Sequence, residues 1–283
     1  MTETANEPGK PPKPGKLAWI SHLRDTPPFP MGKLLGGISL GLVFVIWTLA
    51  TLGDTAETRF VSPTILPSPT EVFGSLSSLI TERQLAQSVM ATLRRLFLGF
   101  GLAILVGVPA GIFAGSFRAF DAFIAPLMLF GRNVPIAALI PLTIVWFGIG
   151  EAQKVLFIFI ATLPFVLTDA AKSVISVHQR YVETAQTLGA TNWQIIHKIL
   201  VPLAVPDMYT NLRHLFGLAF GYIMLAELIN AEHGLGFLLS NSQRRGLSEH
   251  IFLILILIGL LAYVIDRTLL WLQRGLFPYR RDL

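Results

Sequence analysis

Residues 181–202 read YVETAQTLGATNWQIIHKILVP. This stretch is polar and helix-forming, yet it lies between two long apolar stretches of the chain. Gly189 stands where the end of a helix favours a residue with positive φ. Thr191 and Gln194 have the spacing of a capping box, in which each side chain binds the other's free amide. The stretch therefore predicts a helix, a turn and a second helix between two membrane spans, which suits docking better than catalysis.

The first helix of this stretch has its own predicted start and its own apolar face. Ser176 with Gln179 also fits a capping box, so we expect the helix to begin there and to end near Leu188. Tyr181, Ala185 and Leu188 fall on one side of such a helix. An apolar face in water needs a cover, which a partner protein would supply. The alternative is a pair of helices lying on the lipid surface.

The composition is that of a membrane protein. The chain has 283 residues, of which 53% are hydrophobic and 14% charged, and its mean hydropathy is +0.62. Soluble domains carry about 25% charged residues. The apolar residues gather in windows of about 20, the length that crosses a bilayer as a helix, and backbone groups inside lipid must be paired internally. We therefore expect an all-α membrane protein.

The residue counts exclude other chemistries. The chain contains no cysteine, so disulfides and thiol catalysis are excluded. Its net charge of +5 is interpreted as membrane topology and contact with anionic lipid, with no nucleic acid as partner. We expect no catalytic residues and no metal site in the chain.

The hydropathy pattern predicts about six spans. They cover residues 34–52, 93–113, 122–147, 155–171, 203–228 and 251–272. A cleaved signal peptide competes for the first, but its apolar run is longer than usual and a long polar tail precedes it. The third span is interrupted by Pro126, Pro135 and Pro141. In the second span, four glycines are expected to let neighbouring helices approach closely. Those glycines are Gly99, Gly101, Gly107 and Gly111.

The remaining segments flank these spans. We expect residues 1–33 to form a tail that is partly disordered. We expect residues 53–90 to form an external segment with an amphipathic helix at 70–80, and residues 277–283 to form a second tail. Six spans put both tails on one side, and their basic residues favour the cytoplasm. The polar segment between spans four and five then faces the cytoplasm too. Basic residues expected on the outer side weaken this charge argument; they are Arg94, Arg95, Arg244 and Arg245.

The polar segment resembles a known motif. Its order is Glu183-x-Ala185, three residues, Gly189, nine residues, then Ile-x-x-Pro202. This is similar to the EAA loop of the permeases of ABC importers, from which it departs by Thr184 for an alanine and Val201 for a leucine. Similarity to the nitrate, sulfonate and taurine branch extends over residues 66–276, as in NVPIAALIPLTIVWFGIGE at 133–151 and AELINAEHGLGFL at 226–238.

The resemblance implies an architecture and a set of partners. Residues 91–276 would form the type-1 (MetI-like) permease core, with the EAA loop at 176–202. A cytoplasmic ABC ATPase dimer, an external solute-binding protein and a second permease, by default a copy of this chain, would complete an importer in the inner membrane of a bacterium. The EAA residues Glu183, Thr184, Ala185, Gly189 and Pro202 would couple to the ATPase. ATP and Mg²⁺ would bind the partner, because the chain has no phosphate-binding loop.

Charged residues within the spans are candidates for the transport pathway. They are Arg132, Arg213 and His214. A charged side chain inside the bilayer is energetically costly, so each is expected to have a structural or functional role. A cationic lining would suit an anionic solute, because arginine can bind an oxyanion through two donors. The alternative for the arginines is structural, through backbone carbonyls or the interface. Glu227 and His233, near the outer end of span five, are candidate contacts for the binding protein; helix-end chemistry or lipid-interface packing is the alternative.

Two other functions compete. A secondary transporter or channel would show repeated halves and buried coupling carboxylates, and an intramembrane enzyme would need a catalytic cluster within the spans. The sequence indicates neither. The substrate stays open among nitrate, bicarbonate, taurine, alkanesulfonates and pyrimidine precursors.

Overall fold

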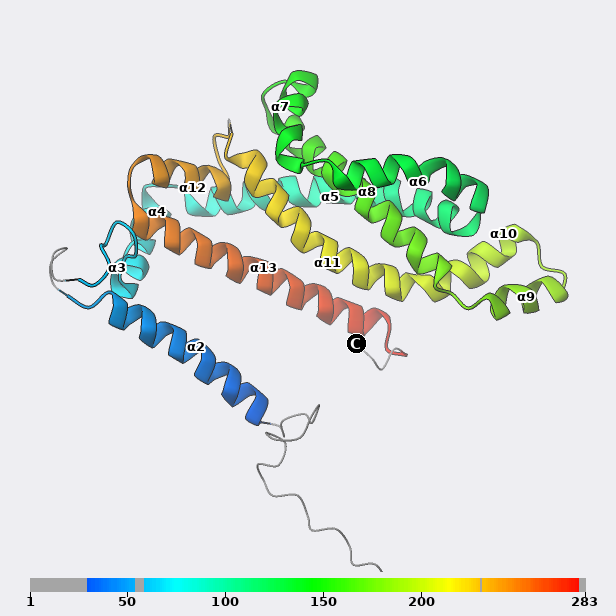
Figure 1. Cartoon of the computed structure of the whole chain (residues 1–283), viewed down its shortest axis with the longest axis horizontal. Helices are drawn as coiled ribbons and strands as arrows, with labels where there is room; N and C mark the ends of the chain where they lie inside the picture. The colour runs from blue at the N-terminus through cyan, green and yellow to red at the C-terminus, as the bar shows by residue number, and fades with distance from the viewer. Residues whose placement is uncertain (1–29, 54–58, 230, 280–283) are drawn as a thin grey trace, which may run out of the picture. The chain divides into compact units, whose positions relative to one another are not determined.

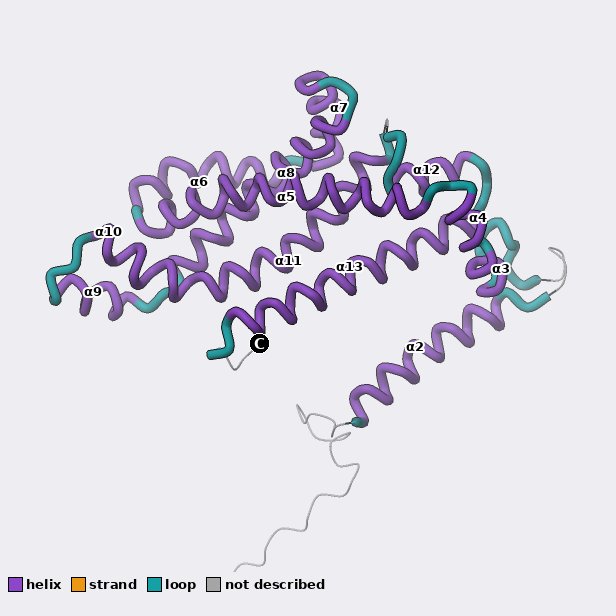
Figure 2. The backbone as a smooth tube through the Cα atoms, turned by 180° about the vertical axis from the view of Figure 1, so that it is seen from behind, coloured by secondary structure: helices purple, strands orange, loops and turns teal. Residues whose placement is uncertain are grey.

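The computed structural model describes residues 30–53, 59–229 and 231–279, and its regular elements there are helices (Figures 1 and 2). The chain divides into two units, Met1–Pro63 and Thr64–Leu283. The first contains α2 (Met31–Ala50). The second contains α3 (Pro69–Gly74), α4 (Leu76–Thr81), α5 (Leu85–Ser116), α6 (Arg118–Asn133), α7 (Ile136–Phe147), α8 (Glu151–Ile175), α9 (Gln179–Thr187), α10 (Asn192–Ile195), the π-helix η1 (Ile196–Leu200), α11 (Val201–Glu227), α12 (Leu235–Arg244) and α13 (Ser248–Leu276).

Helix α2 confirms the helix expected at residues 34–52. It is 20 residues long and apolar enough to cross a membrane, and its leucine, isoleucine and valine side chains are exposed within its own unit. The expected disorder of the tail falls on residues 1–29, outside the described part. The same holds for the end of the C-terminal tail, residues 280–283.

A stripe of small residues on α5 forms the centre of the second unit. Gly99, Ala103, Gly107, Gly111 and Gly115 recur every four residues, one per helical turn, on the side of α5 that packs against α8. A Cβ built at Gly111 would lie 2.5 Å from the carbonyl oxygen of Leu167. The expectation of close approach is therefore correct for three of the four glycines that the sequence singles out. Gly101 lies off the stripe, and a Cβ there would meet no neighbouring atom within 4 Å.

Replacing Gly111 by valine is expected to destabilise the permease. The new side chain would collide with the backbone of α8, and overpacking of this kind costs about 1–3 kcal/mol. Thermal unfolding in detergent measures the effect, with Gly101→Val as the matched control on the same helix. Equal unfolding temperatures for the two variants would contradict the packing described here.

The predicted third span is two helices instead of one. Helices α6 and α7 are bent by 103° at residues 134–135. Pro135 starts α7 and Val134 before it is extended, with ψ of 128°, as a residue preceding proline prefers. Pro126 and Pro141 lie inside α6 and α7 and do not end them. The sequence predicts the interruption at Pro135, but not the size of the bend.

Contacts between helices define two ends of this unit. Helices α5 and α8 run parallel, since Gly99 meets Ile158 and Gly115 meets Val174, and α6 with α7 returns the chain between them. Helix α11 runs the other way, because Asn211 in its first half donates to Ser173 near the end of α8, while its last residue, Glu227, accepts from Thr92 near the start of α5. We call the two ends the α9 end and the α12 end, after the helices that lie there (Figure 1).

The C-terminal helix ends at the α9 end. Gln273 near the end of α13 donates to Thr210 near the start of α11, while His250 near the start of α13 lies 2.9 Å from Ser78 of α4. The segment 176–202 and the end of α13 therefore share one side of the unit. This agrees with the even number of spans predicted between them.

The number of spans depends on how two elements are counted. Four helices of the described residues, α2, α5, α8 and α13, are long and apolar enough to cross a membrane, and α6 with α7 makes a fifth. Helix α11 has 27 residues and runs antiparallel to α8, but it does not reach the same apolarity. Asp207, Arg213 and His214 lower it. The all-helical membrane fold is confirmed. The apolarity test gives up to five spans, and α11 would be the sixth that the sequence predicts.

Two segments have a different secondary structure from the one that the sequence predicts. The amphipathic helix expected at 70–80 is split into α3 and α4 at Ser75. Val72 and Leu79 are buried there, while Phe73 and Ile80 are about half exposed. The loop expected at 230–250 contains a further helix, α12.

Candidate functional site

Helix α9 ends in the backbone geometry that the sequence predicts. Gly189 has φ of +79°, a conformation that glycine adopts without a Cβ penalty. The amide of Gly189 donates to the carbonyl oxygen of Gln186, and the amide of Ala190 to that of Ala185. These two bonds form a Schellman motif, which satisfies the last carbonyls of the helix. The turn after α9 therefore has one fixed conformation.

Helix α10 begins with the predicted capping box, whereas α9 does not. Thr191 accepts from the amide of Gln194, and the Gln194 side chain accepts from the amide of Thr191. The box expected at Ser176 and Gln179 is wrong: α9 starts after His178, which forms no side-chain cap. The hydroxyl of Ser176 instead donates backwards to the carbonyl oxygen of Ser173 at the end of α8.

A small apolar core fixes this segment to the membrane helices. Ala185 of α9 is 6% exposed and packs with residues of four other elements. These are Ala170 and Val174 of α8, Ile195, Ile196 and Leu200 of α10 and η1, and Ala204 and Met208 of α11. A larger side chain at position 185 would push α9 away from them. The segment is therefore a rigid extension of α8 and α11.

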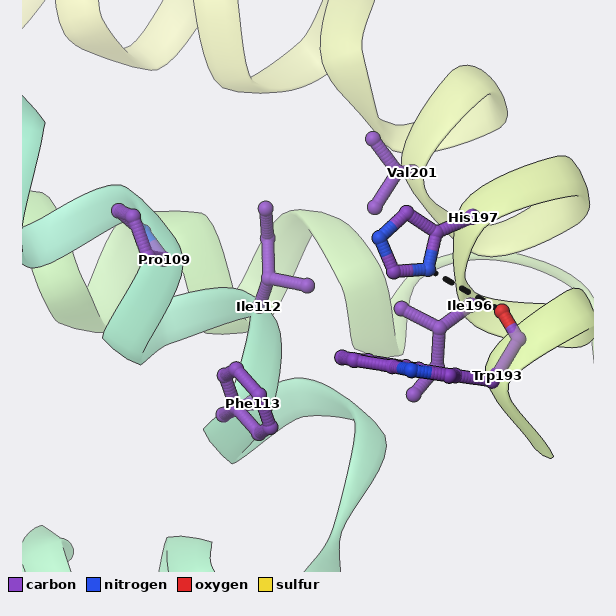
Figure 3. A pocket seen from close by; sticks show the side chains of 7 residues that line it. All are labelled: Pro109, Ile112, Phe113, Trp193, Ile196, His197 and Val201. Atoms are coloured by element: carbon purple, nitrogen blue, oxygen red, sulfur yellow. Dashed lines mark hydrogen bonds between the residues drawn. The ribbon is translucent and has the colours of Figure 1, made fainter.

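A second contact joins the segment to the end of α5. Trp193 lies with its ring 6.0 Å from that of Phe113 and 4.5 Å from that of His197. Nδ1 of His197 donates to the carbonyl oxygen of Trp193 over 3.1 Å. Figure 3 shows Trp193 and His197 on one side of a cavity of about 220 Å³, with Pro109, Ile112 and Phe113 of α5 on the other. The contact between Trp193 and Phe113 thus joins α10 to α5.

The helix that follows the turn runs without a break into α11. Residues 196–200 form a π-helix between α10 and α11. Pro202 has no amide to donate and its ring crowds the carbonyl four residues earlier, so a wider turn just before it relieves that contact. Short π segments are frequent at functional sites. The segment is therefore continuous with α11.

A groove separates α9 from the start of α11. Its volume is about 580 Å³. The lining comes from α9 and its end, with Arg180, Tyr181, Thr184, Ala185 and Leu188, and from η1 and α11, with Lys198, Ile199, Pro202 and Leu203. The predicted residues Thr184, Ala185 and Pro202 therefore lie together. Of the predicted apolar face, Tyr181 and Leu188 are exposed, at 43% and 82%, and lack a cover, whereas Ala185 is covered by the chain itself.

Glu183 projects from a different side of α9. It is exposed, it does not line the groove, and its carboxylate has no hydrogen bond or ion pair with any described residue. Its backbone carbonyl accepts from Thr187 within the helix. The segment thus offers an unpaired acid on one face and an apolar groove flanked by Arg180 and Lys198 on the other.

A buried network of charges lies at the α12 end. Arg95 of α5 donates to Glu227 at the end of α11 over 2.8 Å and to the carbonyl oxygen of His233 over 2.7 Å. Its Nε donates to Glu151 at the start of α8 over 2.7 Å. Glu227 accepts further bonds from the hydroxyl of Thr92 and the amide of Gly236. One arginine thus joins α5, α8, α11 and the segment before α12.

This network changes the interpretation of Glu227. Its side chain is 0% exposed, which leaves no surface for the direct contact with a binding protein that the sequence suggested. A Cβ at Gly234 would lie 2.4 Å from its carboxyl carbon, so the glycines after it are needed for close packing. His233 is partly exposed and its ring nitrogen lies 3.3 Å from Gln87, at the same end.

The three candidate pathway residues have different surroundings. Arg213 of α11 pairs with Asp266 of α13 at 3.1 Å and donates to Gln273 over 3.4 Å, so it joins two helices. His214 is exposed on α11. Arg132 of α6 lines a separate cavity against α8. The structure does not bring the three together.

The sequence offered a clue to the missed network. Arg95 precedes Gly99 by four residues, so it continues the small-residue stripe at its α12 end. A charge on the most closely packed face of a span needs partners there.

Among the described residues, no group of three or more His, Cys, Asp or Glu side chains is placed to hold a metal ion.

Comparison with known proteins agrees with this architecture. Residues 107–279, more than half of the chain, match the family described as "Binding-protein-dependent transport system inner membrane component". A taurine transport system permease protein of Escherichia coli (strain K12) is 32% identical over 247 residues, which is 86% of this chain and 88% of that protein. A bicarbonate transport system permease protein of Synechococcus elongatus is 29% identical over 68% of this chain and 70% of its own length.

The solved structures show the same fold. The MetNI methionine ABC transporter in inward-facing conformations contains a chain with a TM-score of 0.62 at 21% identity, covering 68% of this chain and 95% of that one. The family match and the taurine relative show that the chain is a permease of the ABC importer type. The chain belongs to the family of binding-protein-dependent transport system inner membrane components.

Proposed function

We propose that this chain is the transmembrane subunit of an ATP-driven importer and that residues 179–202 couple it to a partner ATPase. The observation that carries the proposal is the fixed turn at Gly189. Its Schellman bonds, the capping box at Thr191 and the core around Ala185 hold α9 rigidly. A rigid helix with an uncovered groove can transmit a push, whereas a flexible linker would absorb it.

The coupling follows from the connections of the segment. A partner that binds Glu183 and the groove would move α9, and the shared core would carry α8 and α11 with it. ATP and Mg²⁺ would stay in the partner, which closes and opens with nucleotide. The permease itself contributes no bond-making chemistry. The positions of its helices would change because the two states of the partner bind different conformations of the permease with different affinity.

The proposed topology puts the α9 end in the cytoplasm of a bacterium, together with the chain termini. The α12 end would then face the external solute-binding protein. His233 and the exposed Arg244 and Arg245 lie at that end, and we propose them as its contacts. A second copy of this chain would complete the membrane pathway.

The proposed cargo is a small anion such as taurine, another sulfonate or nitrate. The taurine relative supports this choice, since it aligns over most of both chains. The relative named for bicarbonate, which like taurine carries an oxyanion group, supports the same choice. Selection among these anions is expected to lie mainly in the binding protein.

The experiment is a pull-down of the full chain from detergent-solubilised native membranes. We expect an ATPase with a phosphate-binding loop and a solute-binding protein to copurify. Recovery of the chain alone, with uptake in proteoliposomes that needs no ATP, would contradict the proposal and favour a secondary transporter.

A further inference from the structure

We propose that the cavity between α6 and α8 binds the acid group of the imported solute, with Arg132 as its contact. The inference rests on the proposed function and adds a site within the membrane subunit. The cavity has a volume of about 890 Å³, which is in the range of small-molecule sites. Its charged and polar lining residues are Asp121, Arg132, Asn133, Thr168 and Lys172. The rest of the lining is apolar.

Arg132 is oriented by a ring contact and a long ion pair, without donating a hydrogen bond to a described residue. Its guanidinium lies 4.9 Å from the ring centroid of Phe165, a contact that fixes the plane of the group through its face. The side chain is 31% exposed and its nearest carboxylate, Asp169, is 4.0 Å away. It forms no hydrogen bond with any described residue. The N–H donors at its edge are therefore available to a ligand in the cavity.

Other arginines in the spans show what a structural arginine does here. Arg95 donates to Glu151, Glu227 and the carbonyl of His233. Arg213 bonds Gln273 and pairs with Asp266 at 3.1 Å. Both donate hydrogen bonds to neighbouring helices, whereas Arg132 donates none to a described residue and pairs with Asp169 of α8 only at 4.0 Å. A charge in a membrane span is costly. Asp169 offsets part of that cost at Arg132, and a bound oxyanion would offset more of it.

The lining also favours release of the ligand. Lys172 supplies a second cation toward the α9 end of α8, and Asp121 is a carboxylate in the same lining. With Asp169 beside Arg132, two acids balance the two bases. A transport site must bind its cargo weakly enough to let it leave. The ligand that fits is a small solute with one oxyanion group, which two donors of one guanidinium would bind.

The test uses the complete complex of permease, ATPase and binding protein in proteoliposomes. The probes are radiolabelled taurine, ethanesulfonate and nitrate. Arg132→Met is expected to lower uptake at least about tenfold, the loss expected for a charge-assisted hydrogen bond. Stimulation of ATP hydrolysis by loaded binding protein should persist. Arg132→Lys should fall between, and Arg118→Met, an exposed arginine at the start of the same helix, should match the wild type.

The outcomes separate this site from the coupling. Wild-type uptake in Arg132→Met would overturn the site and leave the importer intact. Failure of the wild-type complex to import any probe, while loaded binding protein still stimulates ATP hydrolysis, would refute the anion cargo and the site with it. Absence of that stimulation in the wild type would refute the coupling proposal itself.

A second measurement does not depend on transport. The chain has no cysteine, so Thr168→Cys places one thiol in the cavity. We expect a negatively charged methanethiosulfonate reagent to be favoured over a positively charged one there, relative to Thr187→Cys on exposed α9. Arg132→Met should reduce that preference several-fold. An unchanged preference would show that Arg132 does not attract anions into the cavity.

Discussion

Exchanging Glu183 for lysine is expected to abolish ATP-driven uptake while the protein still folds and inserts. The side chain is exposed and has no partner among the described residues, so the fold loses nothing by the change. A partner surface that meets the acid would instead meet a like charge, which costs several kcal/mol. A loss of about 3 kcal/mol corresponds to a roughly 100-fold weaker contact. Uptake in proteoliposomes, with thermal unfolding in parallel, measures both effects.

The control for this experiment is the same substitution at the other end of the unit. Glu82→Lys changes an exposed acid after α4, and its uptake should stay near the wild-type level. Wild-type uptake in Glu183→Lys would remove the coupling role of α9. Loss of folding in Glu183→Lys would show that the acid has a structural partner.

Removal of the Arg95 charge is expected to cause the largest loss of stability. Arg95→Met leaves Glu227 buried without its cation, and breaking a buried pair costs about 3–5 kcal/mol. The double variant Arg95→Met, Glu227→Leu removes both charges and should recover part of that loss. Thermal unfolding in detergent is expected to rank the wild type as most stable, then the double variant, then Arg95→Met.

Glu151 supplies the comparison for this prediction. Its side chain is 63% exposed although it binds the same arginine, and exposed pairs contribute about 0–1 kcal/mol. Glu151→Gln should therefore unfold close to the wild type. If Glu151→Gln were as unstable as Arg95→Met, the stabilisation would lie between α5 and α8 and not in the buried half of the network.

The sequence predicts those features that depend on local chemistry. The glycine at 189 and the capping box at 191 follow from spacing, because each is satisfied within a few residues. The close packing of α5 on α8 is predicted in part, because small residues indicate close approach. The failure at Ser176 has a local cause as well, since its hydroxyl bonds back to α8 and is not available to cap α9.

Features formed by distant residues are beyond what the sequence predicts. Arg95 and Glu227 are 132 residues apart, and nothing in either segment alone specifies the other. The cavity at Arg132 depends on how α6 lies against α8, which follows from the bend at Pro135 and from Gly131 meeting Pro164. Arg132 and Arg213 are equal candidates by sequence, and the structure separates them by their hydrogen bonds.

Under the proposed function, three parts of the second unit would have separate tasks. The segment 179–202 offers a rigid surface at one end, the Arg95 network holds the helices at the other, and the Arg132 cavity lies on α6 and α8. The small-residue stripe of α5 connects the first two. If α9 couples to an ATPase as proposed, a push there would move α8 and α11 together while their far ends stay joined.

Photo-cross-linking from α9 in native membranes tests the central claim most directly. Leu188→benzoylphenylalanine puts the reactive group on a side chain that is 82% exposed at the groove, and Gln243→benzoylphenylalanine puts it on an exposed position of α12. We predict that position 188 captures an ATPase subunit and that position 243 does not. Capture of the ATPase from position 243, or from neither position, would contradict coupling through residues 179–202.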